Sequence, residues 1–320
     1  MFGIKSGDTS FKGHAALFIA YIIFGLSAPI GKSAMAQGGI PPLSLFFFRV
    51  AGAALLFWIT SLFAPRERVA KRDLLLLCGA TAFGIIINQI SYLKGLALTS
   101  PVDASLLATL GPIITMLVAA VYLKEPITFK KVLGVLVGAG GVLLLILTGA
   151  WMVNGERHLA GNLLCLTSSL SFAIYLTVFR DVVRRYSSIT LMKWMFLFAT
   201  LISAPFCFKS VLLINYEGLS ALTYWKVTFI VFGATFITYM LLPIGQKKLR
   251  PTIVSMYNYL QPMVGSGAAV AMGLDNFGWT KGLSAALVFL GVYIVTQSKS
   301  RAQVEAQRRG ELHSPTLNTK

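Results

Sequence analysis

Long apolar stretches separated by short polar breaks run along most of this 320-residue chain. A helix rising about 1.5 Å per residue needs roughly 20 apolar residues to cross the hydrocarbon core of a bilayer. The apolar runs predict ten such spans, at residues 14–36, 41–64, 74–96, 101–122, 131–149, 159–179, 190–213, 225–247, 252–273 and 279–297. The pattern therefore predicts an all-α integral membrane protein with ten transmembrane helices.

Composition and charge agree with a polytopic membrane protein. Hydrophobic residues make up 56% of the chain and charged residues only 12%. The net charge of +17 would suggest nucleic-acid binding in a soluble protein, but here the basic residues lie almost entirely in the breaks between spans. We therefore expect a lipid bilayer as a partner, and no nucleic acid. No sequence signal specifies an oligomeric state.

Lysine and arginine are distributed unequally between the two sets of loops. The set that includes both termini carries 21 of the 28 basic residues, the other set carries six, and Arg49 lies inside a span. By the positive-inside rule, both termini are expected in the cytoplasm and the protein in the inner (cytoplasmic) cell membrane. The N-terminal "MFGIKSGDTSFKGH" lacks the features of a cleaved signal, so the first span is expected to be retained.

The chain repeats itself at an offset of about 150 residues. The offset pairs Gly95 with Gly245, Pro101 with Pro251, Ser105 with Ser255, Pro112 with Pro262, Glu125 with Asp275, Lys131 with Lys281 and Gly141 with Gly291. An offset of 148 aligns the first span with the sixth, from Gly13 and Gly161. Each half holds five spans, an odd number, so the second half is expected to be inverted in the membrane.

The repeat also predicts the domain organisation. We expect a cytoplasmic N-terminus at 1–13, repeats at 14–149 and 159–297, an external connection at 150–158 and a cytoplasmic tail at 298–320. Inverted repeats are typical of alternating-access transporters, whose substrate site lies near the midplane between the repeats.

Several motifs in order resemble a known family. They are "FFFRVAGAAL" in the second span, "LGPIITMLVAAVYLKEP" in the fourth and "GVLVGAGGVLLL" in the fifth. Together with the doubled five-span pattern, they resemble the EamA family of the drug/metabolite transporter superfamily. The resemblance implies a ten-helix bundle around a central cavity and the transport, often export, of small polar metabolites such as amino acids. Asp275 in "GLDN" departs from Glu125 in "YLKEP".

Arg49 is the charged residue of greatest interest because it lies within the second span. A lipid-facing arginine would cost roughly 2.5 to 3.5 kcal/mol on insertion scales, so we expect its side chain to face the bundle interior. Its guanidinium could bind a substrate carboxylate or phosphate, or it could brace neighbouring helices. Its counterpart in the second repeat is Ala199. The cavity is therefore expected to be asymmetric.

Other polar residues inside the spans could line a pocket or hold helices together. The candidates for the cavity are Lys32, Asn88, Gln89, Tyr92, Tyr175, Tyr239, Tyr257, Asn258 and Gln261. Lys32 could draw anions toward the external mouth or snorkel to the interface. Asp103 is the candidate for proton coupling, although a facilitator or exchanger fits the sequence as well.

Prolines and glycines inside the spans predict local features of the helices. Pro112 and Pro262, which are repeat partners, are candidate hinges or ordinary kinks. Gly134, Gly138 and Gly141 form a small-residue stripe that indicates close helix packing.

An enzyme is the main rival class, with a channel or receptor also considered. The three histidines lie at or beyond span ends, and no span contains a pair of acids. Cys78, Cys165 and Cys207 are odd in number and widely spaced, as expected for small buried hydrophobes. We therefore expect no catalytic residues, metal or cofactor. The prediction is an alternating-access exporter of a small polar metabolite, anionic or zwitterionic.

Overall fold

Helices account for nearly all of the regular structure. The structure is a computed structural model, and it describes residues 6–36, 38–98, 107, 110–149, 159–271 and 279–298. Asp103 and Asp275 lie outside the described residues, as does the side chain of Lys32. The helices are α1 (Ser6–Ala36), α2 (Pro42–Leu62), α3 (Lys71–Thr81), η1 (Ala82–Ile87), α4 (Asn88–Leu98), α6 (Gly111–Tyr122), α7 (Phe129–Gly149), α8 (Leu159–Val178), α9 (Arg180–Arg185), α10 (Ser188–Leu212), α11 (Ala221–Val231), η2 (Phe232–Ile237), α12 (Thr238–Lys248), α13 (Pro251–Met256), η3 (Tyr257–Tyr259), α14 (Leu260–Ala271) and α15 (Trp279–Thr296).

As far as the structure describes them, the predicted spans coincide with helices or with series of joined helices. The third span is α3, η1 and α4, the eighth is α11, η2 and α12, and the ninth is α13, η3 and α14. Most of the fourth span's first half lies outside the described residues, and α6 forms the rest. Within the described part of the chain, five helical stretches are long and apolar enough to cross a membrane, namely Pro42–Leu62, Lys71–Leu96, Ala160–Val178, Ser188–Leu212 and Ala221–Lys248.

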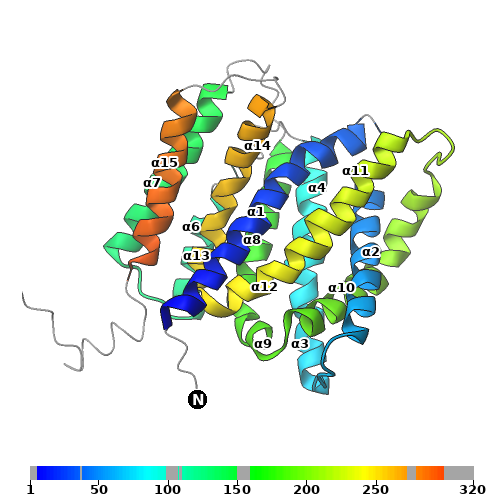
Figure 1. Cartoon of the computed structure of the whole chain (residues 1–320), viewed down its shortest axis with the longest axis horizontal. Helices are drawn as coiled ribbons and strands as arrows, with labels where there is room; N and C mark the ends of the chain where they lie inside the picture. Colours follow the sequence, from blue (N-terminus) through cyan, green and yellow to red (C-terminus); the bar gives the residue numbers. More distant parts are fainter. Residues whose placement is uncertain are drawn as a thin grey trace, which may run out of the picture.

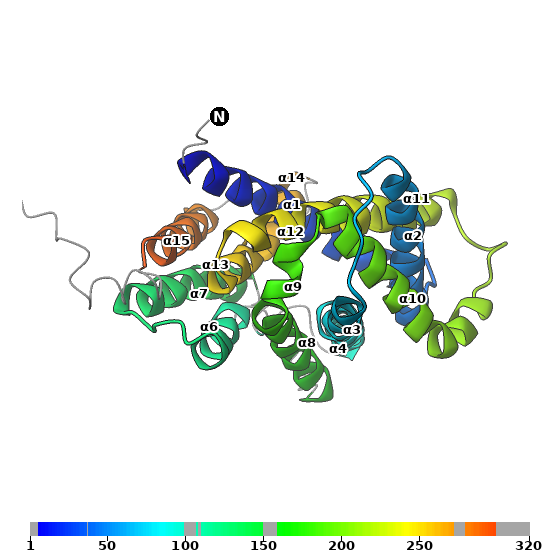
Figure 2. The same ribbon diagram turned by 90° about the horizontal axis from the view of Figure 1, so that it is seen from below.

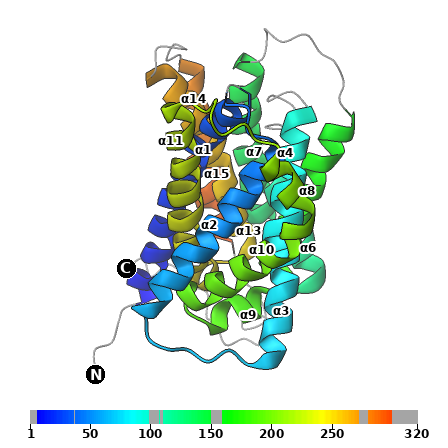
Figure 3. The ribbon, with the colours of Figure 1, turned by 90° about the vertical axis from the view of Figure 1, so that its right-hand side faces the viewer.

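The helices stand side by side with their ends at two opposite faces (Figure 1). α7 and α15 pack together at one end of the molecule, and α2 packs with α10 at the other. The view from below shows α1, α12 and α13 between these pairs (Figure 2). We call the lower face in Figure 1 the basic face; it carries the connections 63–70, 123–128, 186–187 and 249–250. Figure 3 shows α3 and α9 reaching this face.

The glycine stripe of α7 allows its backbone to touch α15. A Cβ atom on Gly134 would lie 2.7 Å from the carbonyl oxygen of Gly291, and one on Gly141 would lie 2.9 Å from that of Ser284. A methyl group fits at neither position without backbone movement. The prediction of close helix packing is therefore confirmed.

The two repeats also pack against each other in matching ways. A Cβ atom on Gly95 in α4 would lie 2.7 Å from Sγ of Cys165 in α8. Its repeat partner, Gly245 in α12, contacts Leu17 in α1, which is itself the repeat partner of Cys165. The third span of each half therefore packs against the first span of the other half.

Two π-helical segments occupy equivalent positions in the repeats. η1 (Ala82–Ile87) and η2 (Phe232–Ile237) lie 150 residues apart, the offset of the sequence repeat. π-helical turns widen a helix and leave carbonyl groups without their usual partners. Side-chain hydroxyls bind such groups here, because Ser171 donates to the oxygen of Phe83 (2.6 Å) and Thr238 donates to that of Gly233 (3.0 Å).

The candidate hinge prolines each follow a break in a helix. The N–H of Leu110 donates to the oxygen of Leu107 (3.1 Å), and Pro112 follows in the first turn of α6. The N–H of Leu260 likewise bonds Tyr257 in η3, two residues before Pro262. Proline lacks an N–H and clashes with the carbonyl four residues earlier, which explains both breaks. Movement at these breaks stays a prediction.

Candidate functional site

Arg49 reaches from the middle of α2 into the bundle. Its Nε donates a hydrogen bond to Oγ1 of Thr235 at 3.0 Å. Thr235 is fully buried in η2, and its own hydroxyl donates to the oxygen of Ile230 (2.8 Å). The prediction that Arg49 faces the interior is confirmed. The guanidinium thus reaches from the first repeat to a buried hydroxyl of the second.

Gln89 and Tyr239 join the two repeats beside this arginine. Nε2 of Gln89 donates to the hydroxyl of Tyr239 at 2.6 Å, and the two residues are 150 positions apart, so each is the other's repeat partner. Oε1 of Gln89 is buried without a donor among the described residues. Tyr92 and Tyr239 lie within electrostatic range of Arg49. Four of the predicted cavity residues therefore lie together.

Aromatic rings surround this polar group. Tyr239 makes edge contacts with Phe24, at 5.9 Å between ring centroids, and with Phe196, at 5.0 Å. The ring centroids of Phe57, in the same helix as Arg49, and Phe236, next to Thr235 in η2, lie 4.7 Å apart. Such apolar walls exclude water and strengthen the electrostatic attraction between the guanidinium and an anion.

A second polar group lies on α1 and η3. The hydroxyl of Tyr257 is 2.6 Å from Nδ1 of His14, and the ring of Tyr21 lies 6.1 Å from that of Tyr257. The hydroxyl of Tyr21 is buried without a partner among the described residues. Tyr21 is also within electrostatic range of Tyr239. Tyr257 therefore connects to the Arg49 group through Tyr21.

The remaining candidates are engaged in local or interhelical bonds. Nδ2 of Asn88 donates to both the carbonyl and the hydroxyl of Ser168 at 3.0 Å, which joins α4 to α8. Gln261 donates to Asn258 at 3.3 Å within their own helix. Tyr175 donates to Oε1 of Gln246 at 2.9 Å, closer to the basic face. The structure thus gives Asn88 a helix-joining contact and leaves the Arg49 group as the candidate site.

Three residues of this network were not among the predicted cavity residues. Thr235 shares a helical face with Tyr239, and their spacing of four residues fits a pocket lining and helix packing equally well. Tyr21 lies four residues before Gly25, where α14 packs closely against α1, since a Cβ atom on Gly25 would lie 2.7 Å from Cβ of Val264. Gln246 lies in the last turns of α12 beside Lys247 and Lys248, where a polar residue looks like an ordinary helix end.

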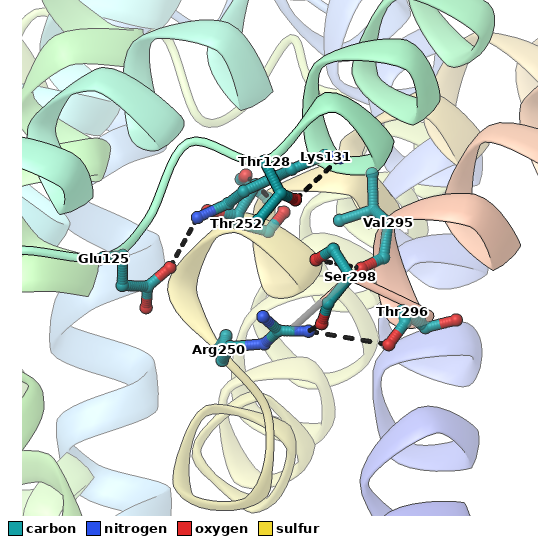
Figure 4. Close-up of polar contacts among 9 residues, drawn as sticks. Glu125, Thr128, Lys131, Arg250, Thr252, Val295, Thr296 and Ser298 are labelled. Atoms are coloured by element: carbon teal, nitrogen blue, oxygen red, sulfur yellow. Dashed lines mark hydrogen bonds and ion pairs between the residues drawn. The ribbon is translucent and has the colours of Figure 1, made fainter. Parts of the chain in front are cut away.

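An ionic cluster closes the basic face. Nζ of Lys131 is 2.6 Å from Oε2 of Glu125, and both side chains are buried. Arg250, at the start of α13, donates to the carbonyls of Ser298 (2.7 Å) and Thr296 (3.5 Å) at the end of α15 (Figure 4). Arg250 is also within electrostatic range of Glu125. Charges from both repeats therefore meet at this face.

Three groups in the loops of the basic face have shifted pKa values. Burial lowers the pKa of Arg250. Burial would raise the pKa of Glu67, but hydrogen bonds from Ser187 and Thr190 outweigh it and lower that pKa. The pKa of Tyr186 is raised, chiefly because its hydroxyl donates to Asp73 at 2.6 Å. These contacts hold the loop after α2 against the loop after α9.

The ninth span is more tightly packed near the basic face than farther along. All six residues of α13 (Pro251–Met256) are buried, and α13 contacts α6 and α8. Residues 261–265 of α14, farther from the basic face, all keep accessible surface. Within this span, the packing is therefore closed at the basic face and looser toward the opposite one.

Comparison with known proteins identifies the family. Residues 11–147 and 159–297 each match the EamA-like transporter family. The chain belongs to the EamA-like transporter family. It is therefore a multi-pass membrane transporter built from two EamA repeats, and not an enzyme.

Relatives of this EamA protein cover most of its length at low identity. An uncharacterized transporter from Bacillus subtilis, YetK, is 21% identical over 292 residues, or 90% of this chain and 88% of the relative. A probable terminal-alkyne amino-acid exporter from Streptantibioticus cattleyicolor is 25% identical over 174 residues, or 54% of this chain and 57% of that exporter. A solved crystal structure shares the fold with a TM-score of 0.72 and 19% identity, covering 95% of this chain and 99% of that one.

Proposed function

We propose that this protein is an alternating-access carrier that exports a small anionic or zwitterionic metabolite, such as an amino acid. One observation carries the proposal. Arg49 reaches from one repeat to Thr235 in the other, and no carboxylate is paired with it among the described residues. A buried cation without a counter-ion is costly, and an anionic substrate would supply that counter-ion.

The surroundings of Arg49 favour a substrate with both charges. Guanidinium N–H groups other than Nε can bind a carboxylate in a fork, as arginine commonly does. Oε1 of Gln89, buried without a donor among the described residues, can accept from an ammonium or hydroxyl group. The name of the Streptantibioticus relative, a probable amino-acid exporter, agrees with this chemistry.

The distribution of basic loops supports the membrane orientation that we propose. The connections at the basic face include Arg66, Arg68, Lys124 and Arg250. We therefore place this face and both termini in the cytoplasm of the cell, with the looser face outside. Repeats 14–149 and 159–297, joined by 150–158, would exchange their conformations during the transport cycle.

Counterflow in proteoliposomes tests the substrate class. Proteoliposomes are preloaded with pooled amino acids, nucleosides or phosphorylated metabolites. The protein should exchange an anionic or zwitterionic pool, and the Arg49→Ala variant should lose that exchange. Arg49→Lys is the matched control: it keeps the charge and loses the fork, so it should retain part of the exchange. Transport of cations alone, unaffected by Arg49→Ala, would overturn the proposal.

Asp103→Asn distinguishes proton coupling from exchange, because only a coupled carrier would lose stimulation by a pH gradient.

A further inference from the structure

A small cavity lies near the basic face, away from Arg49. α8, α9, α12 and the start of α13 enclose it, and its volume is about 10 Å³. Such a volume accommodates about one water-sized particle. The lining includes Tyr175, Arg180, Gln246, Leu249, Pro251 and Val254.

Two N–H donors that line the cavity have no acceptor. Nε of Arg180 and Nε2 of Gln246 are both buried without a partner among the described residues. Tyr175 donates to Oε1 of Gln246 at 2.9 Å, which orients the amide and leaves its NH₂ group free. Leaving a buried donor unpaired is costly, so these two groups require an acceptor between them.

The electrostatic surroundings of the cavity are positive. Arg180 is within electrostatic range of both Arg184 and Arg250; Asp181 acts on Arg184 and Glu125 acts on Arg250, so the three arginines exceed the two acids by one charge. No acidic residue lines the cavity. A bound negative charge would therefore reduce repulsion among these arginines and satisfy both donors.

We propose that this cavity binds one small anion, which in cells is chloride. A water molecule could donate to the hydroxyl oxygen of Tyr175 or to the second lone pair of Oε1 of Gln246, so it is the excess of arginines, and not the count of acceptors, that favours an anion over water. Chloride only accepts hydrogen bonds, so it matches the two unpaired donors. The ion joins Arg180 at the start of α9 to Gln246 in α12, and thereby ties these two helices together.

Thermal unfolding of the purified protein in detergent tests the site. In a titration at constant ionic strength, chloride takes the place of gluconate, which is too large for the cavity. The unfolding temperature should rise with the chloride concentration and then saturate. A chloride concentration about tenfold above its dissociation constant should raise the unfolding temperature by about 2 to 4 °C. Crystals grown in bromide should show an anomalous peak between Arg180 and Gln246.

Two substitutions of Gln246 separate the ion from general stability. Gln246→Leu removes the donor, so the protein should be less stable and insensitive to chloride. Gln246→Glu places a fixed carboxylate beside Arg180, so the protein should keep its stability and lose the response to chloride. Lys248→Gln, an exposed position on the same helix, is the control and should respond as the unaltered protein does. Equal unfolding temperatures in chloride and gluconate, no bromide peak, or a response that persists in both Gln246 variants would each overturn the site and leave water as its occupant.

Discussion

Arg49 and Thr235 form the contact on which substrate binding is expected to depend. The hydroxyl of Thr235 accepts from Arg49 and donates to Ile230, so it both orients the guanidinium and satisfies a carbonyl of the π-helical turn. Hydrogen bonds to charged groups contribute roughly 1.5 to 3 kcal/mol. Thr235 would act through Arg49, as a positioning residue.

We therefore expect Thr235→Val to weaken substrate binding by about tenfold or more, with a smaller effect on the maximal transport rate. Thr235→Ser keeps the hydroxyl and should restore binding. Thr238→Val is the matched control, because it removes a hydroxyl bond to Gly233 in the same π-helical region without touching Arg49. Concentration dependence of uptake into proteoliposomes measures the effect, and equal half-saturation in the two valine variants would contradict the positioning role.

The sequence predicts the depth of Arg49 but not its partner. A cation in an apolar span must face the interior, because lipid gives it no counter-ion. Thr235 is 186 residues away, and which hydroxyl meets the guanidinium depends on how α2 packs against η2. Gln89 and Tyr239 were predicted separately as cavity residues, whereas their direct bond requires the two halves to be assembled.

At the scale of whole helices, the glycine contacts of α7 offer a sharp test of packing. A Cβ on Gly134 would meet the backbone of Gly291, which cannot move as a flexible side chain can. A Cβ on Gly140 in the same helix would meet nothing within 4 Å. The two glycines therefore lie in the same helix, but only Gly134 contacts another helix closely.

Gly134→Ala is expected to destabilise the protein by about 1 to 3 kcal/mol, as overpacking usually does. Gly140→Ala should be neutral or slightly stabilising, since alanine favours the helix and meets no neighbour. Unfolding by denaturing detergent in mixed micelles measures both changes. Equal stability of the two variants would show that α7 and α15 separate more easily than their contacts indicate.

The helices were predictable from the sequence, and most of their distortions were not. Apolar length alone locates the spans, and the prolines at 112 and 262 indicate where two of them break. η1 and η2 left no such signal, because a π-helical turn keeps the apolar composition of its span. The structure alone shows that the two π-helical turns lie 150 residues apart, at equivalent positions of the repeats.

For the whole molecule, the inverted repeats relate the observed conformation, closed at the basic face, to the conformation that is open at that face. If the two repeats exchange conformations during transport, each contact is replaced by its repeat image. The bond between Gln89 and Tyr239 is its own image, so it should persist in both states. The cluster of Glu125, Lys131 and Arg250 is not its own repeat image, because the repeat partner of Arg250 is Ser100. This cluster should therefore separate in the opposite conformation.

Reversible cross-links distinguish these two kinds of contact. Gly95 with Cys165 and Gly245 with Leu17 are images of each other and are both present in one conformation, so both should persist through the cycle. In a background with Cys78 and Cys207 replaced by alanine, a disulfide from Gly95→Cys to Cys165 should therefore leave transport close to that of the reduced protein. A reducible cross-link between cysteines at 125 and 250 should stop transport until it is reduced, because it holds the basic face closed. If the first bridge also stopped transport, α4 and α8 would have to separate during the cycle, and the carrier would not move by a simple exchange of its two repeats.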